Sequence, residues 1–305
     1  MKRRLKDYLI IALKGIAMGA ADVVPGVSGG TIAFISGIYQ ELIETINAIN
    51  LKALKTLKDE GVKAAWRAIN GNFLISLLSG IGLSVITLAQ IIKWLLENKP
   101  VMVWSFFFGL VLASIYFVGK QVSKWNFKHI MVLILGALVA YYITIMPAMG
   151  GNNSLLFFFV SGALAICAMI LPGISGSFIL VLLGAYKPVL EALHTKDLKT
   201  IALLMLGAVV GLLTFSRLLK WMFDHHKDTT LAVLTGFIIG SLNKIWPWKN
   251  IVKSEVIEGK LKVILDESIS PFNYQGDNHL FLAIILAFVG FGLIMILEKT
   301  AQAKN

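Results

Sequence analysis

Two short elements of this 305-residue sequence combine proline, glycine and serine inside apolar stretches. The first is Val24-Pro-Gly-Val-Ser-Gly-Gly30, and the second is Leu171-Pro-Gly-Ile-Ser-Gly-Ser177. Proline removes a backbone donor, and glycine lowers helix propensity. We therefore expect the helix that contains each element to break, at Pro25–Gly26 in the first and at Pro172–Gly173 in the second.

The residues after each break are suited to binding an anion. Serine is a good N-cap, and the free N–H groups and positive dipole end of a new half-helix attract negative charge. Glycine lets an anion approach the backbone, and hydroxyl groups add donors. The predicted anion-binding residues are Ser28, Gly29, Gly30, Thr31, Ser175, Gly176 and Ser177. In the alternative interpretation, the small residues only let two kinked helices pack closely.

Arg217 is a further candidate for anion binding. It follows the uncharged stretch Leu203–Ser216. An arginine inside a membrane segment is costly and usually faces a cavity or a partner, and its forked donors suit phosphate. In the alternative, its side chain extends to the membrane interface, where Lys220 and Trp221 also lie.

Two acidic residues, Asp22 and Glu41, are candidates to bind a coupling proton or sodium ion. Asp22 precedes the first break by three residues, where a carboxylate is costly, and it could instead pair with Lys14 or Arg217. Glu41 lies in the first predicted helical hairpin, where an interfacial position is the simpler interpretation. No histidine has zinc-ligand spacing, so we predict neither a metal nor a cofactor.

The composition shows what must position these residues. Apolar residues make up 57% of the chain and charged residues 15%, against about 25% charged in an ordinary soluble domain. The 57 residues of Ile130–Tyr186 contain no Asp, Glu, Lys or Arg, and a bilayer span needs about 20. We conclude that this is an all-α polytopic membrane protein. A soluble enzyme, a disordered tail and a nucleic-acid-binding protein are excluded, and the single Cys167 excludes an intramolecular disulfide.

The basic residues predict the topology, because cytoplasmic loops carry an excess of Lys and Arg. The N-terminus, the segment Leu51–Asn70 and the loop Lys120–Lys128 are basic, and the loop Pro147–Ser154 is neutral. We expect about ten membrane-embedded segments, some re-entrant or half-length, with both termini in the cytoplasm. The predicted outer loop, 247–279, holds several lysines and breaks the rule.

The sequence also contains an internal repeat. The two Pro-Gly-x-Ser-Gly elements match at an offset of 147 residues, and a second series of matches has an offset of 127. Under the predicted topology the copies have opposite orientations, which gives one site two nearly equivalent conformations. The alternative is a duplication that serves stability alone. The predicted parts of the single membrane domain, 1–305, are repeat one (about 8–120), a linking helix (129–147), repeat two (about 154–246), an outer loop (247–279) and a final helix (280–298).

The doubled motif resembles the bacterial polyprenyl-phosphate transporter family over nearly the whole chain. It is carried by Asp22-Val-Val-Pro-Gly-Val-Ser-Gly-Gly-Thr31 and by Leu171-Pro-Gly-Ile-Ser-Gly176. The resemblance implies a translocase, not an enzyme, in the bacterial cytoplasmic membrane. Such a protein returns undecaprenyl phosphate from the outer to the inner leaflet, which recycles the lipid carrier for peptidoglycan and other envelope polymers. The anion would then be the phosphate of this lipid.

Two other functions stay open on the sequence alone. Pro-Gly-x-Ser is also similar to a motif of the membrane undecaprenyl-pyrophosphate phosphatases, in which an arginine follows the serine. Here Gly29 and Gly176 occupy that position, and phosphoryl transfer needs dense charge stabilisation. An ion-coupled carrier of small anions could use the same half-helix ends without a lipid.

Overall fold

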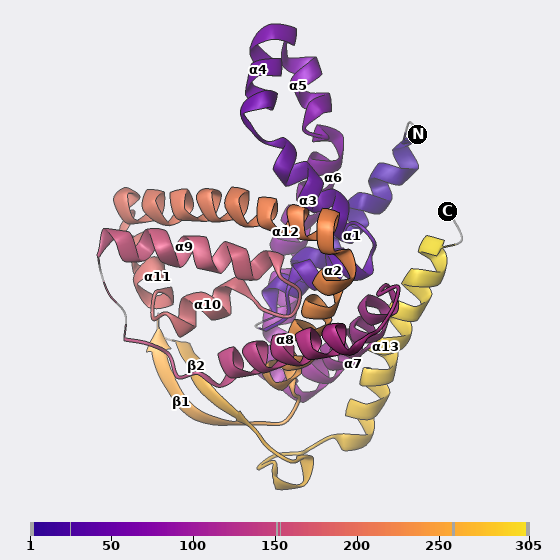
Figure 1. Ribbon diagram of the computed structural model, residues 1–305. Helices are drawn as coiled ribbons and strands as arrows, with labels where there is room; N and C mark the ends of the chain where they lie inside the picture. The colour runs from indigo at the N-terminus through magenta and orange to yellow at the C-terminus, as the bar shows by residue number, and fades with distance from the viewer. Residues whose placement is uncertain (1–2, 25, 151, 153, 258–259, 303–305) are drawn as a thin grey trace.

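The computed structural model describes residues 3–24, 26–150, 152, 154–257 and 260–302, which fold into a mostly helical structure (Figure 1). The first half contains α1 (Leu5–Val23), α2 (Gly29–Ile35), α3 (Tyr39–Ala48), α4 (Leu51–Glu60), α5 (Val62–Ala68), α6 (Gly71–Asn98) and α7 (Pro100–Lys120). The second half contains α8 (Phe127–Ile145), α9 (Leu155–Ile170), α10 (Gly176–Leu182), α11 (Tyr186–Thr195), α12 (Leu198–Ser241), η1 (Leu242–Ile245), β1 (Lys249–Ile257), β2 (Lys260–Ser268), η2 (Pro271–Asn273) and α13 (Leu280–Gln302).

The long apolar helices confirm a multi-pass membrane protein. Within the described residues, four helical segments are long and apolar enough to span a bilayer: α6, α7, α8 and α12 together with η1. The bent pair α10–α11, with an angle of 103° between its helices, brings the number to five if it counts as one span. Shorter apolar helices are α9 and the Leu280–Ile296 part of α13. The expected number of ten embedded segments stays a prediction.

Capping side chains mark where several helices begin. The Asn126 side chain accepts from His129 N at the start of α8, and Ser154 accepts from Phe157 N at the start of α9. Asp197 accepts from the backbone of Lys199 and Thr200 at the start of α12. These groups satisfy backbone donors that have no partner inside the helix.

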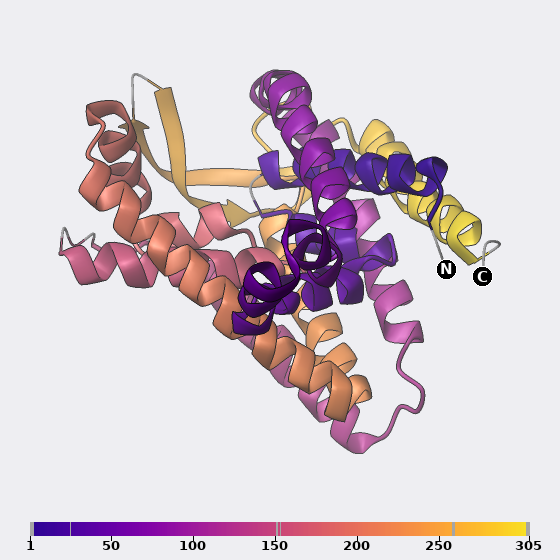
Figure 2. The same ribbon diagram turned by 90° about the horizontal axis from the view of Figure 1, so that it is seen from above.

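Helix α12 is divided by a kink at His226, whose backbone is non-helical (φ −140°, ψ 47°). A straight helix of its 44 residues would be about 66 Å long, roughly twice the hydrocarbon thickness. The kink therefore separates an N-terminal arm, 198–225, from a C-terminal arm, 227–241. The N-terminal arm runs beside α9 in Figure 1 and Figure 2.

The same close helix contact occurs twice in the molecule. A Cβ placed on Gly15 of α1 would lie 2.3 Å from the Leu77 carbonyl oxygen of α6. A Cβ on Gly162 of α9 would lie 2.1 Å from the Leu204 carbonyl oxygen of α12. The second pair is the counterpart of the first under the two sequence offsets. In both places only glycine lets the two backbones approach so closely.

A second repeated contact involves the helix that follows each copy. A Cβ on Gly109 of α7 would lie 1.8 Å from the Ala287 carbonyl oxygen of α13. A Cβ on Gly236 in the C-terminal arm of α12 would lie 2.2 Å from the Leu133 carbonyl oxygen of α8. Helix α8 follows α7 in the chain but packs on α12, while α13 follows α12 but packs on α7. The last helix of each copy thus packs on the helix that follows the other copy in the chain.

The predicted outer loop contains a hairpin that corrects the all-α prediction. Strands β1 and β2 pair antiparallel, with a register irregularity between Ile251 and Ser254. The segment is rich in β-branched residues, including Val252, Val256 and Val263, which favour strands. The prediction of a loop here rested only on the charges of the segment. Gly151, in the other predicted outer loop, lies outside the described residues.

Candidate functional site

Both Pro-Gly elements interrupt helices at the predicted positions. Helix α1 ends at Val23, the chain turns through Gly26 with φ +81°, and α2 begins at Gly29. Pro25 lies outside the described residues. In the second element α9 ends at Ile170, Gly173 has φ +95°, and α10 begins at Gly176. Positive φ is the conformation that favours glycine, which explains its place after each proline.

Ser28 links the start of α2 to the second element through hydrogen bonds. Its hydroxyl is fully buried, accepts from Gly30 N at 3.1 Å and lies 2.9 Å from Met169 O and 3.2 Å from Leu171 O. Those two carbonyls belong to the end of α9. The hydroxyl can donate to one of them at a time. One side chain therefore caps a helix in the first copy and binds the break in the second.

Two further contacts join the elements. Gly173 N donates to Thr31 Oγ1 at 3.0 Å in the interior. A Cβ on Gly30 would lie 2.5 Å from Ile170 O, so the first turn of α2 rests directly against the end of α9. The structure thus brings Ser28, Gly30 and Thr31 of the first copy to the break of the second.

Asp22 occupies the N-terminal end of α2. Its Oδ1 accepts from Gly29 N at 2.7 Å, and a Cβ on Gly29 would lie 2.5 Å from Asp22 Oδ2. The carboxylate therefore takes the place that an external anion would need at this helix start. Lys14, one of its predicted partners, donates to Ser36 O at 2.5 Å.

The start of α10 is arranged differently. Ser175 is its N-cap but makes no side-chain capping bond; its hydroxyl instead pairs with Ser177 Oγ at 2.8 Å. Met169 occupies the position that corresponds to Asp22, so no carboxylate is provided there by the repeat. Ser177 is exposed. Of the two helix starts, that of α10 is the one without an internal carboxylate on its backbone donors.

Arg217 and Glu41 lie apart from this junction. Arg217 is exposed on the N-terminal arm of α12 and makes no hydrogen bond or ion pair with another described residue. Glu41 of α3 accepts from Arg3 Nη2 at 2.6 Å and from Asn70 Nδ2 at 2.8 Å. These bonds tie the N-terminal segment and the start of α6 to α3. Neither residue contacts a Ser-Gly start in the structure.

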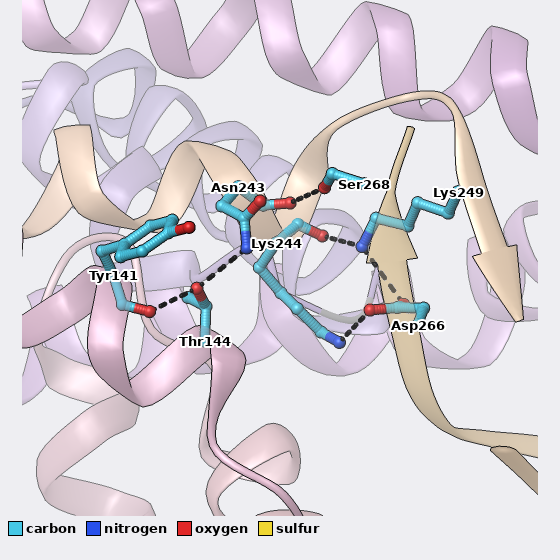
Figure 3. Close-up of polar contacts among 7 residues, drawn as sticks. All are labelled: Tyr141, Thr144, Asn243, Lys244, Lys249, Asp266 and Ser268. Carbon is cyan, nitrogen blue, oxygen red and sulfur yellow. Dashed lines mark hydrogen bonds and ion pairs between the residues drawn. The ribbon is translucent and has the colours of Figure 1, made fainter. Parts of the chain in front are cut away.

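A cluster that sequence analysis missed lies where η1 meets the hairpin (Figure 3). Lys244 Nζ is 2.9 Å from Asp266 Oδ1, and Lys249 Nζ is 3.2 Å from Asp266 Oδ2 and 2.6 Å from Lys244 O. Asp266 is 22 residues from Lys244 along the chain, so only the hairpin brings them together. Two signals were available in the sequence: Lys244 follows the uncharged run Thr229–Asn243, and the predicted outer loop held lysines that broke the positive-inside rule.

Burial sets the electrostatics of this cluster. It lowers the pKa of Lys249 to about 8, and the nearby Lys244 ammonium acts in the same direction, while Asp266 opposes both. Burial raises the pKa of Asp266, but the Lys249 and Lys244 ammonium groups outweigh it and lower that pKa below its ordinary value. The cluster combines two basic side chains with one carboxylate, so its formal charge is one positive charge in excess.

Comparison with known proteins supports the family resemblance that the doubled motif indicated. The family model described as undecaprenyl phosphate translocase-like matches residues 18–262. A protein of Vibrio cholerae serotype O1 named polyprenyl-phosphate transporter is 45% identical over 307 residues, covering 99% of this chain and 100% of the relative. A protein of Staphylococcus aureus with the same name is 32% identical over 253 residues, covering 77% of this chain and 85% of the relative. No solved structure matches the chain.

Proposed function

Because the chain belongs to the undecaprenyl phosphate translocase-like family, we propose that it is a polyprenyl-phosphate transporter that moves undecaprenyl phosphate across the membrane. The observation that carries this proposal is the 45% identity to a named polyprenyl-phosphate transporter over 99% of the chain. In a bacterial cytoplasmic membrane, such a transporter recycles the lipid carrier of cell-envelope synthesis. Both relatives are named transporters, not enzymes.

Transport in this proposal uses an inverted-topology repeat. The duplicated contacts of α1 with α6 and of α9 with α12 support two structurally equivalent copies. Equivalent copies of opposite orientation give a site near the midplane two conformations of similar energy, open to opposite faces. The start of α1 and the end of α13 lie on the same side of the molecule in both views, which fits two cytoplasmic termini (Figures 1 and 2).

The proposed phosphate site lies at the junction of the two elements. It comprises Ser28, Gly29, Gly30, Thr31, Ser175, Gly176 and Ser177, with Arg217 as a contact at another stage of the cycle. In the conformation seen here, the start of α10 is the more accessible half, because Asp22 and Ser28 already occupy the donors at the start of α2. The phosphate would reach the α2 half only after the Asp22 carboxylate moves or is neutralised.

Asp22 is therefore the proposed coupling residue. Protonation would remove its charge from Gly29 N and free that donor for the phosphate, so proton binding and lipid binding would favour the same state. Sodium could compensate the carboxylate in the same way. Glu41 stays a prediction as a second coupling residue, although Arg3 and Asn70 already hold its carboxylate.

The decisive experiment measures leaflet exchange and phosphate release together. Purified protein is reconstituted into liposomes that contain labelled undecaprenyl phosphate, and exchange between leaflets is followed beside the release of inorganic phosphate. We expect exchange without release. Release would indicate a phosphatase, and transport of free phosphate without lipid exchange would indicate a small-anion carrier.

The first prediction tests the orientation of the two copies. In a Cys167→Ser background, Lys124→Cys should react with a membrane-impermeant thiol reagent only after the cells are opened, because its loop is basic. Asn152→Cys, in the neutral loop, should react in intact cells. Reaction of both positions from the same side of the membrane would remove the inverted assignment, and the reverse pattern at both would contradict the predicted cytoplasmic N-terminus.

The second prediction concerns Arg217. If its guanidinium holds the phosphate during the cycle, Arg217→Lys should reduce lipid exchange by about tenfold, because lysine lacks the bidentate fork. Arg67→Lys, in the exposed helix α5, is the matched control and should exchange lipid normally. Full exchange by Arg217→Lys in correctly inserted protein would mean that Arg217 only reaches the interface.

A further inference from the structure

The cluster of Lys244, Lys249 and Asp266 contains more positive charge than its own carboxylate neutralises. Both ion pairs are largely shielded: the side-chain exposures are 14% for Lys244, 10% for Lys249 and 19% for Asp266. A largely buried charge normally has a partner, since desolvation is expensive. The two lysines share one aspartate, so one positive charge is not neutralised by the described side chains of this cluster.

The donors of the cluster are only partly used. Among the described residues, Lys249 Nζ donates to Asp266 and to Lys244 O, whereas Lys244 Nζ makes one hydrogen bond, to Asp266. A lysine ammonium has three donors. Lys244 Nζ therefore has donors that an incoming oxyanion can accept from. Lys249 and Lys244 share the single Asp266 carboxylate, so neither ammonium is fully neutralised.

The cluster adjoins both broken elements. The Lys244 stem packs against Gly26 of the first break, where a Cβ would lie 2.8 Å from Lys244 Cγ. The Lys244 ammonium lies over the Phe178 ring of α10, 4.9 Å from its centroid. Phe178 directly follows Ser177, so the cation stands beside the helix start that lacks a carboxylate. Lys249 in turn lies over the Trp104 ring of α7 at 5.2 Å.

Figure 3 shows how the hairpin builds this arrangement. Lys244 at η1 and Lys249 on β1 approach Asp266 on β2 from two sides. The end of η1 is fixed in place because Asn243 Nδ2 donates to Thr144 Oγ1 at 3.2 Å and Ser268 Oγ donates to Asn243 O at 3.1 Å. The cluster is therefore a preorganised part of the structure, held by both the helical body and the hairpin.

We propose that Lys244 and Lys249 form a docking subsite for a phosphate monoester, in which Asp266 is an internal competitor that the phosphate displaces. The inference rests on the proposed function, since it identifies where the lipid headgroup is first held before it reaches the α10 start. The phosphate replaces one carboxylate with up to two negative charges, which matches two lysines better than Asp266 does. The hydrocarbon chain stays outside this subsite.

Removing a lysine and removing the carboxylate are expected to have opposite effects on phosphate binding. Lys249→Gln keeps the Lys244–Asp266 pair but removes the excess charge, so it should weaken binding of farnesyl phosphate to the full chain in nanodiscs by about tenfold. Asp266→Asn removes the competitor and should strengthen binding several-fold. Glu267→Gln, the exposed neighbouring residue on β2, should bind as the unchanged protein does.

A purely structural ion pair gives a different pattern. In that case Asp266→Asn would lower thermal stability and would not strengthen binding, and Lys249→Gln would bind normally; either binding result overturns the proposal. If Asp266→Asn does not fold, Lys249→Gln decides alone, because it retains one complete ion pair. Inorganic phosphate serves as a second probe: equal sensitivity to Lys249→Gln with both probes assigns the subsite to the phosphate group, whereas a response to inorganic phosphate alone overturns the assignment to a lipid headgroup.

Leaflet exchange by the unchanged protein tests the proposed transporter function separately from the docking subsite. If exchange is normal but Lys249→Gln and Asp266→Asn do not change farnesyl phosphate binding, the subsite is rejected and the transporter function stands. Absence of exchange with charge-dependent binding rejects transport and leaves an anion-binding cluster.

Discussion

Ser28→Ala is expected to destabilise the protein, whereas Ser175→Ala is expected to weaken lipid binding at unchanged stability. Ser28 is fully buried and its hydroxyl serves Gly30 N and the carbonyls at the end of α9, so its removal leaves buried polar groups unsatisfied. Such a loss costs about 1–3 kcal/mol. Within the part of the chain that the structure describes, Ser175 Oγ pairs only with Ser177 Oγ. Ser177 is exposed, so its hydroxyl can bond to water when Ser175 is replaced by alanine. As a proposed phosphate ligand, Ser175 should contribute about tenfold in affinity.

The two serines are matched by the repeat itself, so each variant is the control for the other. Thermal unfolding in detergent reports stability, and farnesyl phosphate titration reports affinity. Equal loss of stability in both variants would contradict the different roles that we assign. Equal loss of affinity without loss of stability would place the phosphate at both helix starts in the conformation seen here.

This pair also shows what the sequence could and could not predict. Proline and glycine act locally, so the ends of α1 and α9 followed from the sequence, and so did the capping positions of Ser28 and Ser175. The bonds from Ser28 to Met169 and Leu171 did not, because they join residues more than 140 positions apart. Residue type was enough to identify the two serines as candidates, but tertiary packing determines which groups their hydroxyls contact.

Asp22 and Asp266 illustrate the same limit for charged residues. The cost of a carboxylate beside a helix break marked Asp22 as unusual, but its partner is a backbone N–H rather than the lysine or arginine that sequence analysis considered. Asp266 gave no signal, since it lies in a loop with charges of both signs. Its significance comes from the hairpin, which places it between Lys244 and Lys249. A charge pattern predicts location relative to the membrane better than it predicts pairing.

Gly176→Val is expected to abolish lipid exchange, and Gly29→Val is expected to reduce it strongly. A Cβ on Gly176 would lie 2.6 Å from Ala165 O, which is helix backbone and cannot move without separating α10 from α9. A Cβ on Gly29 would lie 2.5 Å from Asp22 Oδ2, a side-chain atom that can rotate away. Overpacking of this kind costs about 1–3 kcal/mol before any effect on the phosphate, and bulk also blocks its approach to the backbone.

Smaller and matched substitutions separate packing from anion approach. Gly82→Val on α6 meets nothing within 4 Å and should exchange lipid normally, which controls for a valine in a membrane helix. Gly29→Ala should displace Asp22, and the added change Asp22→Ala should relieve that clash and restore folding. If phosphate needs this helix start, the double variant should fold well and still bind farnesyl phosphate poorly. Normal binding and exchange by both valine variants would leave the two elements as kinks that only let helices pack.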